Sequence, residues 1–184
     1  MYPRLRFLIA AGVSALAAVA GLAACGGGGS SNSGPPQTIR GPGFRFAAPG
    51  GWLNRRQGTQ VSAAPKPVAA ELVSVSRFPL LKPYSPALFA KVTKELDASA
   101  GDLAQRLEGN VRKRYTTTVA GQRVRQYLLL YPQNPKEPKQ GDYSALLTYV
   151  LRGKVEYELF CRWAGDSKTA PEYCTQLGTS FRPV

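Results

Sequence analysis

Alternation of large and small side chains predicts strands in the first half of this chain. Residues 43–49 alternate in this way and end at a Pro-Gly-Gly turn, which is typical of a strand followed by a reversal. Residues 59–64 and 71–78 show a similar pattern, and Pro79 follows the second of them. We therefore expect three strands here, the last of them ending at Pro79.

The pattern changes to a helical period between residues 86 and 109. Ser85-Pro86 is typical of a helix N-terminus, with serine as the cap and proline in the first turn. Apolar residues then recur at helical spacing on one face: Leu88, Val92, Leu96, Leu103 and Leu107. We expect this stripe to pack on the core. A shorter helix is expected around residues 171–177.

Two hairpins are expected in the second half of the chain. Their arms are residues 112–119 and 122–131 around a turn at Ala120-Gly121, and residues 143–151 and 154–163 around a turn at Arg152-Gly153. In the second hairpin, one face is apolar and holds Val150, Val155, Tyr157, Leu159, Cys161 and Trp163. Together these elements predict an α+β fold, with helices packed on an antiparallel sheet of about six strands.

The first 25 residues have the three regions of a bacterial export signal. Arg4 and Arg6 supply positive charge, residues 7–24 form an uncharged run of 18 residues, and Leu22-Ala23-Ala24-Cys25 follows at its end. This tetrapeptide resembles the lipobox of bacterial lipoproteins, in which the cysteine takes a diacylglyceryl group before cleavage. An uncleaved membrane helix is the alternative, because 18 apolar residues lie at the lower limit of a span.

The export signal sets the expected division of the chain. Residues 1–24 are a lipoprotein signal peptide, residues 25–37 are the lipidated Cys25 with a flexible Gly/Ser/Pro tether, and residues 38–184 are a single domain. Such a protein lies on the extracytoplasmic face of a bacterial membrane, in the cell envelope, where the acyl chains on Cys25 hold it.

The net charge and the absence of histidine limit the classes of partner and of catalytic site that this chain can have. The chain holds 24 Lys and Arg against 11 Asp and Glu; without Arg4 and Arg6 of the leader the balance is 22 against 11, a net charge of +11. This field attracts anionic partners, and export argues against nucleic acid as one of them. Without histidine, a Ser-His-Asp triad, a Cys-His pair and a histidine-containing zinc site are excluded.

Two cysteines remain once Cys25 is lipidated. An even pair in an oxidising compartment favours a disulfide between Cys161 and Cys174, which would tie the terminal helix to the last long strand. Free thiols or a redox site are the alternatives, although the spacing is not Cys-x-x-Cys.

Four arginines share one face of the first expected hairpin. The turn at Ala120-Gly121 predicts which residues lie opposite each other: Arg114 and Tyr127, Thr116 and Arg125, and Thr118 and Arg123. In this register one face of the hairpin carries all four arginines: Arg112, Arg114, Arg123 and Arg125. Clustered like charges are destabilising unless an anion neutralises them, and the guanidinium fork suits phosphate and carboxylate. The face is therefore a candidate anion-binding site. The alternative is an ordinary solvated outer face of the sheet.

A pair of carboxylates offers the one candidate for catalysis. Glu156 and Glu158 project from the same face of a strand, as in the acid pairs of glycoside hydrolases. Lys154 and Arg162 lie on that face too and can simply neutralise them. The chain contains neither a Ser-x-x-Lys motif nor a phosphate-binding glycine loop.

Short motifs spread over residues 43–182 resemble the PsbP-like domain found in many bacterial lipoproteins. They are the opening Gly43-Phe44-x-Phe46 with Pro49 and Gly51-Trp52, the central helix, the two long hairpins and the closing Ser180-Phe181-Arg182. The resemblance implies an antiparallel sheet between helices, an α/β/α sandwich. It also implies roles in scaffolding, assembly or binding.

These observations lead to one expected function and two alternatives. We expect a membrane-anchored extracytoplasmic lipoprotein that acts as a non-catalytic binding or scaffold module, with no metal and no cofactor. Its candidate partners, beyond the membrane that holds Cys25, are an anionic lipid, a wall polymer or an envelope protein. A carboxylate-dependent hydrolase that uses Glu156 and Glu158, or a purely structural envelope component, are the alternatives.

Overall fold

The computed structural model describes residues 34–134, 136 and 141–184. The expected signal peptide at residues 1–24, the lipidation site Cys25 and residues 26–33 of the expected tether lie outside the described residues. In chain order the elements are β1 (Gln37–Gly41), β2 (Phe44–Ala48), β3 (Leu53–Gln57), β4 (Gln60–Ala64), β5 (Leu72–Tyr84), the 3-10 helix η1 (Pro86–Leu88), α1 (Phe89–Arg106), β6 (Asn110–Val119), β7 (Gln122–Pro132), β8 (Asp142–Ala164), α2 (Glu172–Ser180) and β9 (Arg182–Pro183).

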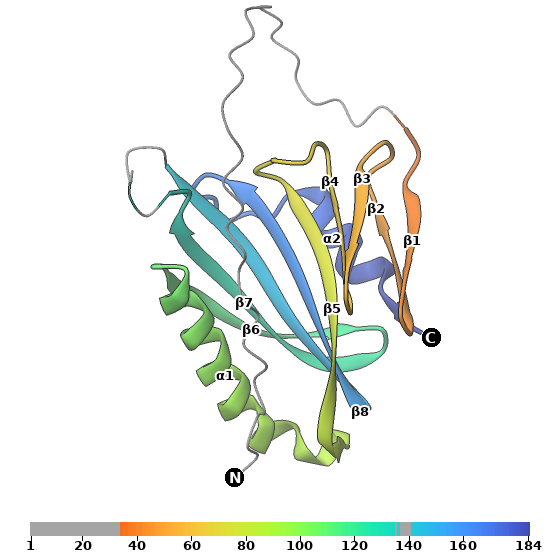
Figure 1. Ribbon diagram of the computed structural model, residues 1–184. Helices are drawn as coiled ribbons and strands as arrows, with labels where there is room; N and C mark the ends of the chain where they lie inside the picture. The colour runs from red at the N-terminus through yellow and green to blue at the C-terminus, as the bar shows by residue number, and fades with distance from the viewer. Residues whose placement is uncertain (1–33, 135, 137–140) are drawn as a thin grey trace, which may run out of the picture.

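The strands form two sheets (Figure 1). The large sheet is antiparallel and has the order β3-β4-β5-β8-β7-β6, and the small sheet has the order β1-β2-β9. Helix α1 packs on one face of the large sheet, whereas α2 and the small sheet share a core with the other face. The predicted α+β fold with an antiparallel sheet of about six strands is therefore confirmed. The separate small sheet of β1, β2 and β9 was not predicted.

The first predicted hairpin is confirmed with its register. Strands β6 and β7 pair antiparallel, with Thr116 opposite Arg125 and Thr118 opposite Arg123. Ala120 and Gly121 have φ angles of 50° and 74°, which are the positive values that a two-residue turn of this kind requires.

The extended run β8 contains both arms of the second predicted hairpin. A straight strand of its 23 residues would be about 75 Å long, yet the N–H of Gly165 donates to the carbonyl of Asp142 at 2.7 Å. The chain therefore reverses inside β8, and the exposed residues 152–154, with Gly153 at φ 54°, mark the reversal. The first arm pairs with β7 and the second with β5, and Figure 1 shows the arms meeting near the label β8.

Two boundaries differ from the prediction. Strand β5 does not end at Pro79 but continues to Tyr84, because the pairing of β5 with β8 shifts between these two residues and an irregular ladder tolerates proline. The helix begins later than expected, at Phe89, after the 3-10 turn η1, and Ser85 makes no side-chain capping bond.

The start of the domain also differs slightly from the expected residue 38. Strand β1 begins at Gln37, whose side-chain amide donates to the carbonyls of Pro49 and Trp52 at 3.1 and 2.6 Å. The last residue of the expected tether therefore belongs to the folded domain.

Two apolar clusters lie on the two faces of the large sheet. One, on the side of α1, holds Leu96 together with the partly buried Val92, Leu103 and Leu107, so the predicted helical stripe packs on the core. The other joins the sheet to α2 and the small sheet through buried aromatic residues: Phe44, Phe46, Trp52, Tyr157, Trp163 and Phe181. Among the described residues, no helix has the length and apolar character needed to cross a bilayer.

Candidate functional site

The structure places α1 on the hairpin face that carries Arg114, Arg123 and Arg125, three of the four predicted arginines. Arg125 donates from Nε to Oδ1 of Asp97 at 2.9 Å and from Nη2 to Oδ2 at 3.2 Å, and Asp97 lies on α1. The hydroxyl of Tyr127 donates to the same Oδ1 at 2.7 Å. A helix of the same chain therefore packs against this face, which is not simply open to solvent, and it supplies a carboxylate to one of the arginines.

Asp97 is held in its charged form by these contacts. Burial alone would raise the pKa of its carboxyl, but hydrogen bonds from Arg125 and Tyr127 and the charges of Arg125 and Arg114 outweigh burial and lower that pKa. Burial, together with the bond to Asp97, raises the pKa of Tyr127 well above its ordinary value, so the phenol stays protonated and donates. The cluster is a neutralised link between α1 and the sheet.

The other three arginines differ in their surroundings. Arg112 pairs with Asp166 at 3.1 Å in an exposed ion pair. It lies where the pairing of β6 with β7 skips one residue, so the predicted register that put Arg112 on the same face as Arg114 does not extend to it. The guanidinium of Arg123 lies 4.5 Å from the ring centre of Phe89, at the start of α1. Arg114 is exposed. The four residues share a hairpin, and two of them have carboxylate partners in the chain, which reduces the charge that remains for an external anion.

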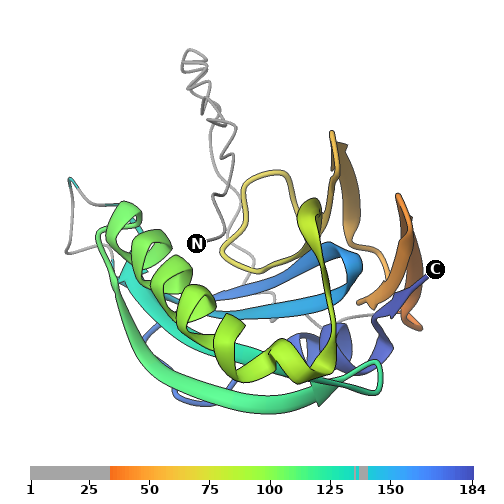
Figure 2. The same ribbon diagram turned by 90° about the horizontal axis from the view of Figure 1, so that it is seen from below.

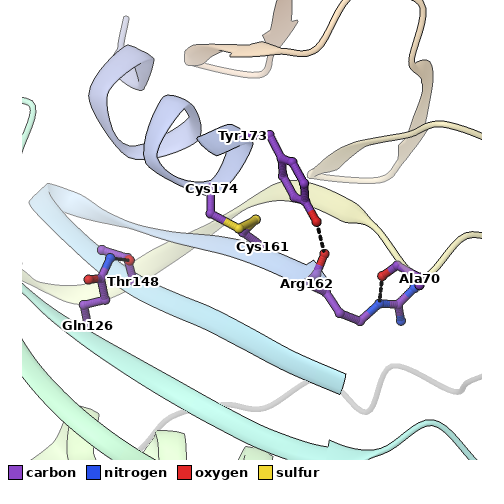
Figure 3. The surroundings of a disulfide bond; sticks show 7 residues. All are labelled: Ala70, Gln126, Thr148, Cys161, Arg162, Tyr173 and Cys174. Atoms are coloured by element: carbon purple, nitrogen blue, oxygen red, sulfur yellow. Dashed lines mark hydrogen bonds between the residues drawn. A yellow bond between two sulfur atoms is a disulfide. The ribbon is translucent and has the colours of Figure 1, made fainter. Parts of the chain in front are cut away.

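The predicted disulfide is present. The sulfur atoms of Cys161 and Cys174 lie at bonding distance, with Cα atoms 5.5 Å apart, and the bond joins the second arm of β8 to α2 (Figure 3). Next to it, the hydroxyl of Tyr173 donates to the carbonyl of Arg162 at 3.2 Å. Both contacts tie α2 to the same stretch of β8.

The candidate carboxylate pair lies outside the groove described below. Glu156 is buried, with 6% of its surface exposed, and Glu158 is half-buried. Arg162, which the sequence offered as their neutralising partner, instead donates to the carbonyls of Ala70 and Ala69 at 2.9 and 2.7 Å. Neither glutamate lines the groove described next.

A groove of about 530 Å³ lies between the β6–β7 hairpin and α2, on the sheet face opposite α1. Its floor includes Gln126, whose amide donates to the hydroxyl of Thr148 at 2.8 Å beside the disulfide (Figure 3). The polar residues of the lining are Thr117, Thr118, Gln126, Thr175, Thr179 and Arg182. The sequence pattern did not reveal this groove, because its two walls are formed by segments about 50 residues apart in the chain.

The described lining of the groove consists mainly of hydrogen-bonding and apolar groups. Among the described residues that line it, hydroxyl groups and one amide offer hydrogen bonds, Arg182 is the single charged side chain, and Cys174 is held in the disulfide. A threonine hydroxyl needs an adjacent base to act as a nucleophile, and the described lining contains no carboxylate and no lysine. In the described part of the chain, no three His, Cys, Asp or Glu side chains gather as a metal site would require.

The small sheet carries a second set of arginines that the sequence analysis missed. Arg40 lies opposite Arg45, and Arg45 lies opposite Arg182, on three adjacent strands. The signal in the sequence is charge: residues 1–70 contain no Asp or Glu. We name Arg40, Arg45 and Arg182 the arginine ladder.

Comparisons with known proteins show the fold alone. A crystal structure from Bacteroides thetaiotaomicron matches 80% of this chain with a TM-score of 0.56 at 11% identity, and this chain spans 48% of that protein. The yeast Ran-binding protein Mog1p matches 81% of this chain and 95% of its own, with a TM-score of 0.42 at 10% identity. No family of known proteins matches the sequence, and no curated protein does.

Proposed function

We propose that this chain is an exported, lipid-anchored lipoprotein with a PsbP-like domain, a non-catalytic module that binds an envelope partner on the extracytoplasmic face of a bacterial membrane. The observation that carries the proposal is the groove between the β6–β7 hairpin and α2, which offers hydrogen bonds without catalytic groups in its described lining. The lipobox-like Leu22-Ala23-Ala24-Cys25 supports the location, and the disulfide between Cys161 and Cys174 fits an oxidising compartment.

The chemistry of the groove favours an extended polar segment of an envelope protein as its occupant. Thr117 and Thr118 belong to β6, which is an edge strand of the large sheet, and an edge strand can pair with an extended chain through its backbone. Thr175 and Thr179 face it from α2 and can hydrogen-bond to peptide groups. With Arg182 as the one charged lining group, a neutral or acidic segment fits better than a basic one.

Gly178 provides a direct test, because it lines the groove and a Cβ added there would meet no atom within 4 Å. Gly178→Phe should therefore fill the groove while leaving the backbone of α2 in place. Gly101 in α1 is a matched control, since it is also helical and its Cβ would also enter open space, away from the groove.

The experiment is affinity capture from the cell's own envelope fraction with the acylated full chain. Wild type and Gly101→Phe should retain the same protein partner, and Gly178→Phe should lose it. A partner retained equally by Gly178→Phe contradicts the groove as the binding site. Capture of no partner by any of the three proteins favours a purely structural envelope component.

A further inference from the structure

The arginine ladder lies on the outer face of the small sheet. Residues that are directly opposite in antiparallel strands point to the same side, so the side chains of Arg40, Arg45 and Arg182 share one face. All three residues are exposed, whereas their neighbours Ile39, Phe44 and Phe46 point to the core from the other face. The small sheet is thus apolar on its inner side and strongly basic on its outer side.

Direct pairing of like charges across strands is unfavourable, so the ladder favours an anionic ligand. Opposite residues in a sheet have Cβ atoms about 5 Å apart, and like charges at that distance destabilise the pair. Within the described residues, neither Arg40 nor Arg45 forms a hydrogen bond or an ion pair through its side chain. Arg182 is held by its Nη1, which donates to the carbonyls of Thr179 and Phe181 at 2.8 and 2.7 Å. This anchoring leaves its Nη2 and Nε available to a ligand.

The position of the ladder in the chain points to the membrane as the source of that anion. Strand β1 begins at Gln37, twelve residues after Cys25. Twelve residues span at most about 40 Å when fully extended, so an anchor at Cys25 would keep the ladder within reach of the lipid headgroups. Phosphate groups of anionic lipids match the guanidinium fork, and their local concentration at the surface would be high.

We propose that Arg40, Arg45 and Arg182 form a headgroup-binding face that holds the domain against anionic phospholipids. The location rests on the proposed acylation of Cys25. In this arrangement the small sheet faces the bilayer, while α1 lies on the opposite side of the molecule (Figure 2).

Contact with the bilayer can be measured on the full acylated chain in lipid nanodiscs. Thr38→Cys carries a fluorophore on the ladder face, because Thr38 is exposed and two residues from Arg40 on the same strand. Ala98→Cys, which is exposed on α1, carries the control fluorophore. The quencher is attached to lipid headgroups in discs of phosphatidylcholine, alone or with about one third phosphatidylglycerol.

Phosphatidylglycerol should increase quenching at residue 38 and not at residue 98. Arg40→Gln with Arg45→Gln should lower the ratio of bound to detached domain about thirtyfold, because each arginine near an anionic surface contributes about 1 kcal/mol. Arg55→Gln with Arg56→Gln is the matched control: these arginines are exposed on β3, and their removal changes the net charge equally. The control should keep the effect of phosphatidylglycerol.

Three outcomes overturn the proposal: quenching at residue 38 that ignores phosphatidylglycerol, equal losses from the two arginine pairs, or equal quenching at residues 38 and 98. Acylation is scored separately, by metabolic labelling of Cys25 with a fatty acid. A labelled chain without lipid-dependent quenching refutes the ladder alone. An unlabelled chain refutes the anchor, and the same chain added to free vesicles then tests whether the ladder still selects phosphatidylglycerol.

Discussion

Replacing Asp97 by Asn tests whether the link between α1 and the sheet stabilises the domain. Asn keeps the shape of the side chain but replaces the charged carboxylate, whose oxygens accept two hydrogen bonds from Arg125 and one from Tyr127. Arg125 is then left without its carboxylate partner, with its side chain only 17% exposed. We expect the free energy of unfolding to fall.

The magnitude follows from the burial of the pair. Hydrogen bonds to charged groups contribute roughly 1.5–3 kcal/mol each. Because the side chain of Asp97 is 31% exposed, solvent screens part of its interaction with Arg125 and lowers this contribution. We therefore expect a loss of about 2 kcal/mol for the whole cluster, which is roughly 4–8 °C in the melting temperature of a domain this size. A double-mutant cycle with Arg125→Gln should give a coupling free energy of about 1–2 kcal/mol.

The effect should depend on pH in a defined direction. The pKa of Asp97 is lower in the folded state than in the unfolded chain, so its contribution is present above the unfolded pKa of about 3.9. It is lost as the pH falls through the folded pKa, because the carboxyl is then neutral in the wild type as well. The stability gap between wild type and Asp97→Asn should be full at neutral pH and should close under strongly acidic conditions.

Urea unfolding followed by circular dichroism measures the gap at each pH. Asp166→Asn is the control, since it removes the same charge from an ion pair with Arg112 whose side chains are about half exposed. Such a pair contributes about 0.5 kcal/mol. A loss from Asp97→Asn no larger than that of the control, or a gap that does not change as the pH is lowered, would refute the reasoning.

Three further predictions concern the disulfide, α1 and the anchor. Replacing Cys161 and Cys174 together by Ser should lower the free energy of unfolding by about 3 kcal/mol, and an unchanged melting temperature would contradict a stabilising bond. Gly101→Ala should raise the free energy of unfolding by roughly 0.8 kcal/mol, because the added Cβ meets no atom within 4 Å; destabilisation in urea unfolding would show that the site is tighter. Cys25→Ser should abolish labelling with a fatty acid, and continued labelling would disprove the lipobox assignment.

The hairpins and the disulfide could be predicted because short-range rules determine them. At Ala120-Gly121 the turn chemistry sets the register of β6 and β7, and a two-residue period then decides which side chains share a face. The same reasoning placed Val150, Leu159 and Trp163 on one face of the second hairpin, and these residues lie in one core cluster. The prediction of the disulfide rested on the number of cysteines and on the expected oxidising compartment.

Only the tertiary structure decided what covers each face. The sequence places Arg125 and Arg123 on one side of a hairpin, but whether solvent, an anion or α1 meets them depends on how the chain packs over long range. The arginine ladder escaped the sequence analysis for the same reason, because Arg45 and Arg182 become neighbours only when β9 pairs with β2. Periodicity reports the local conformation and the face of each side chain, whereas the partner of that face is set by contacts between segments far apart in the chain.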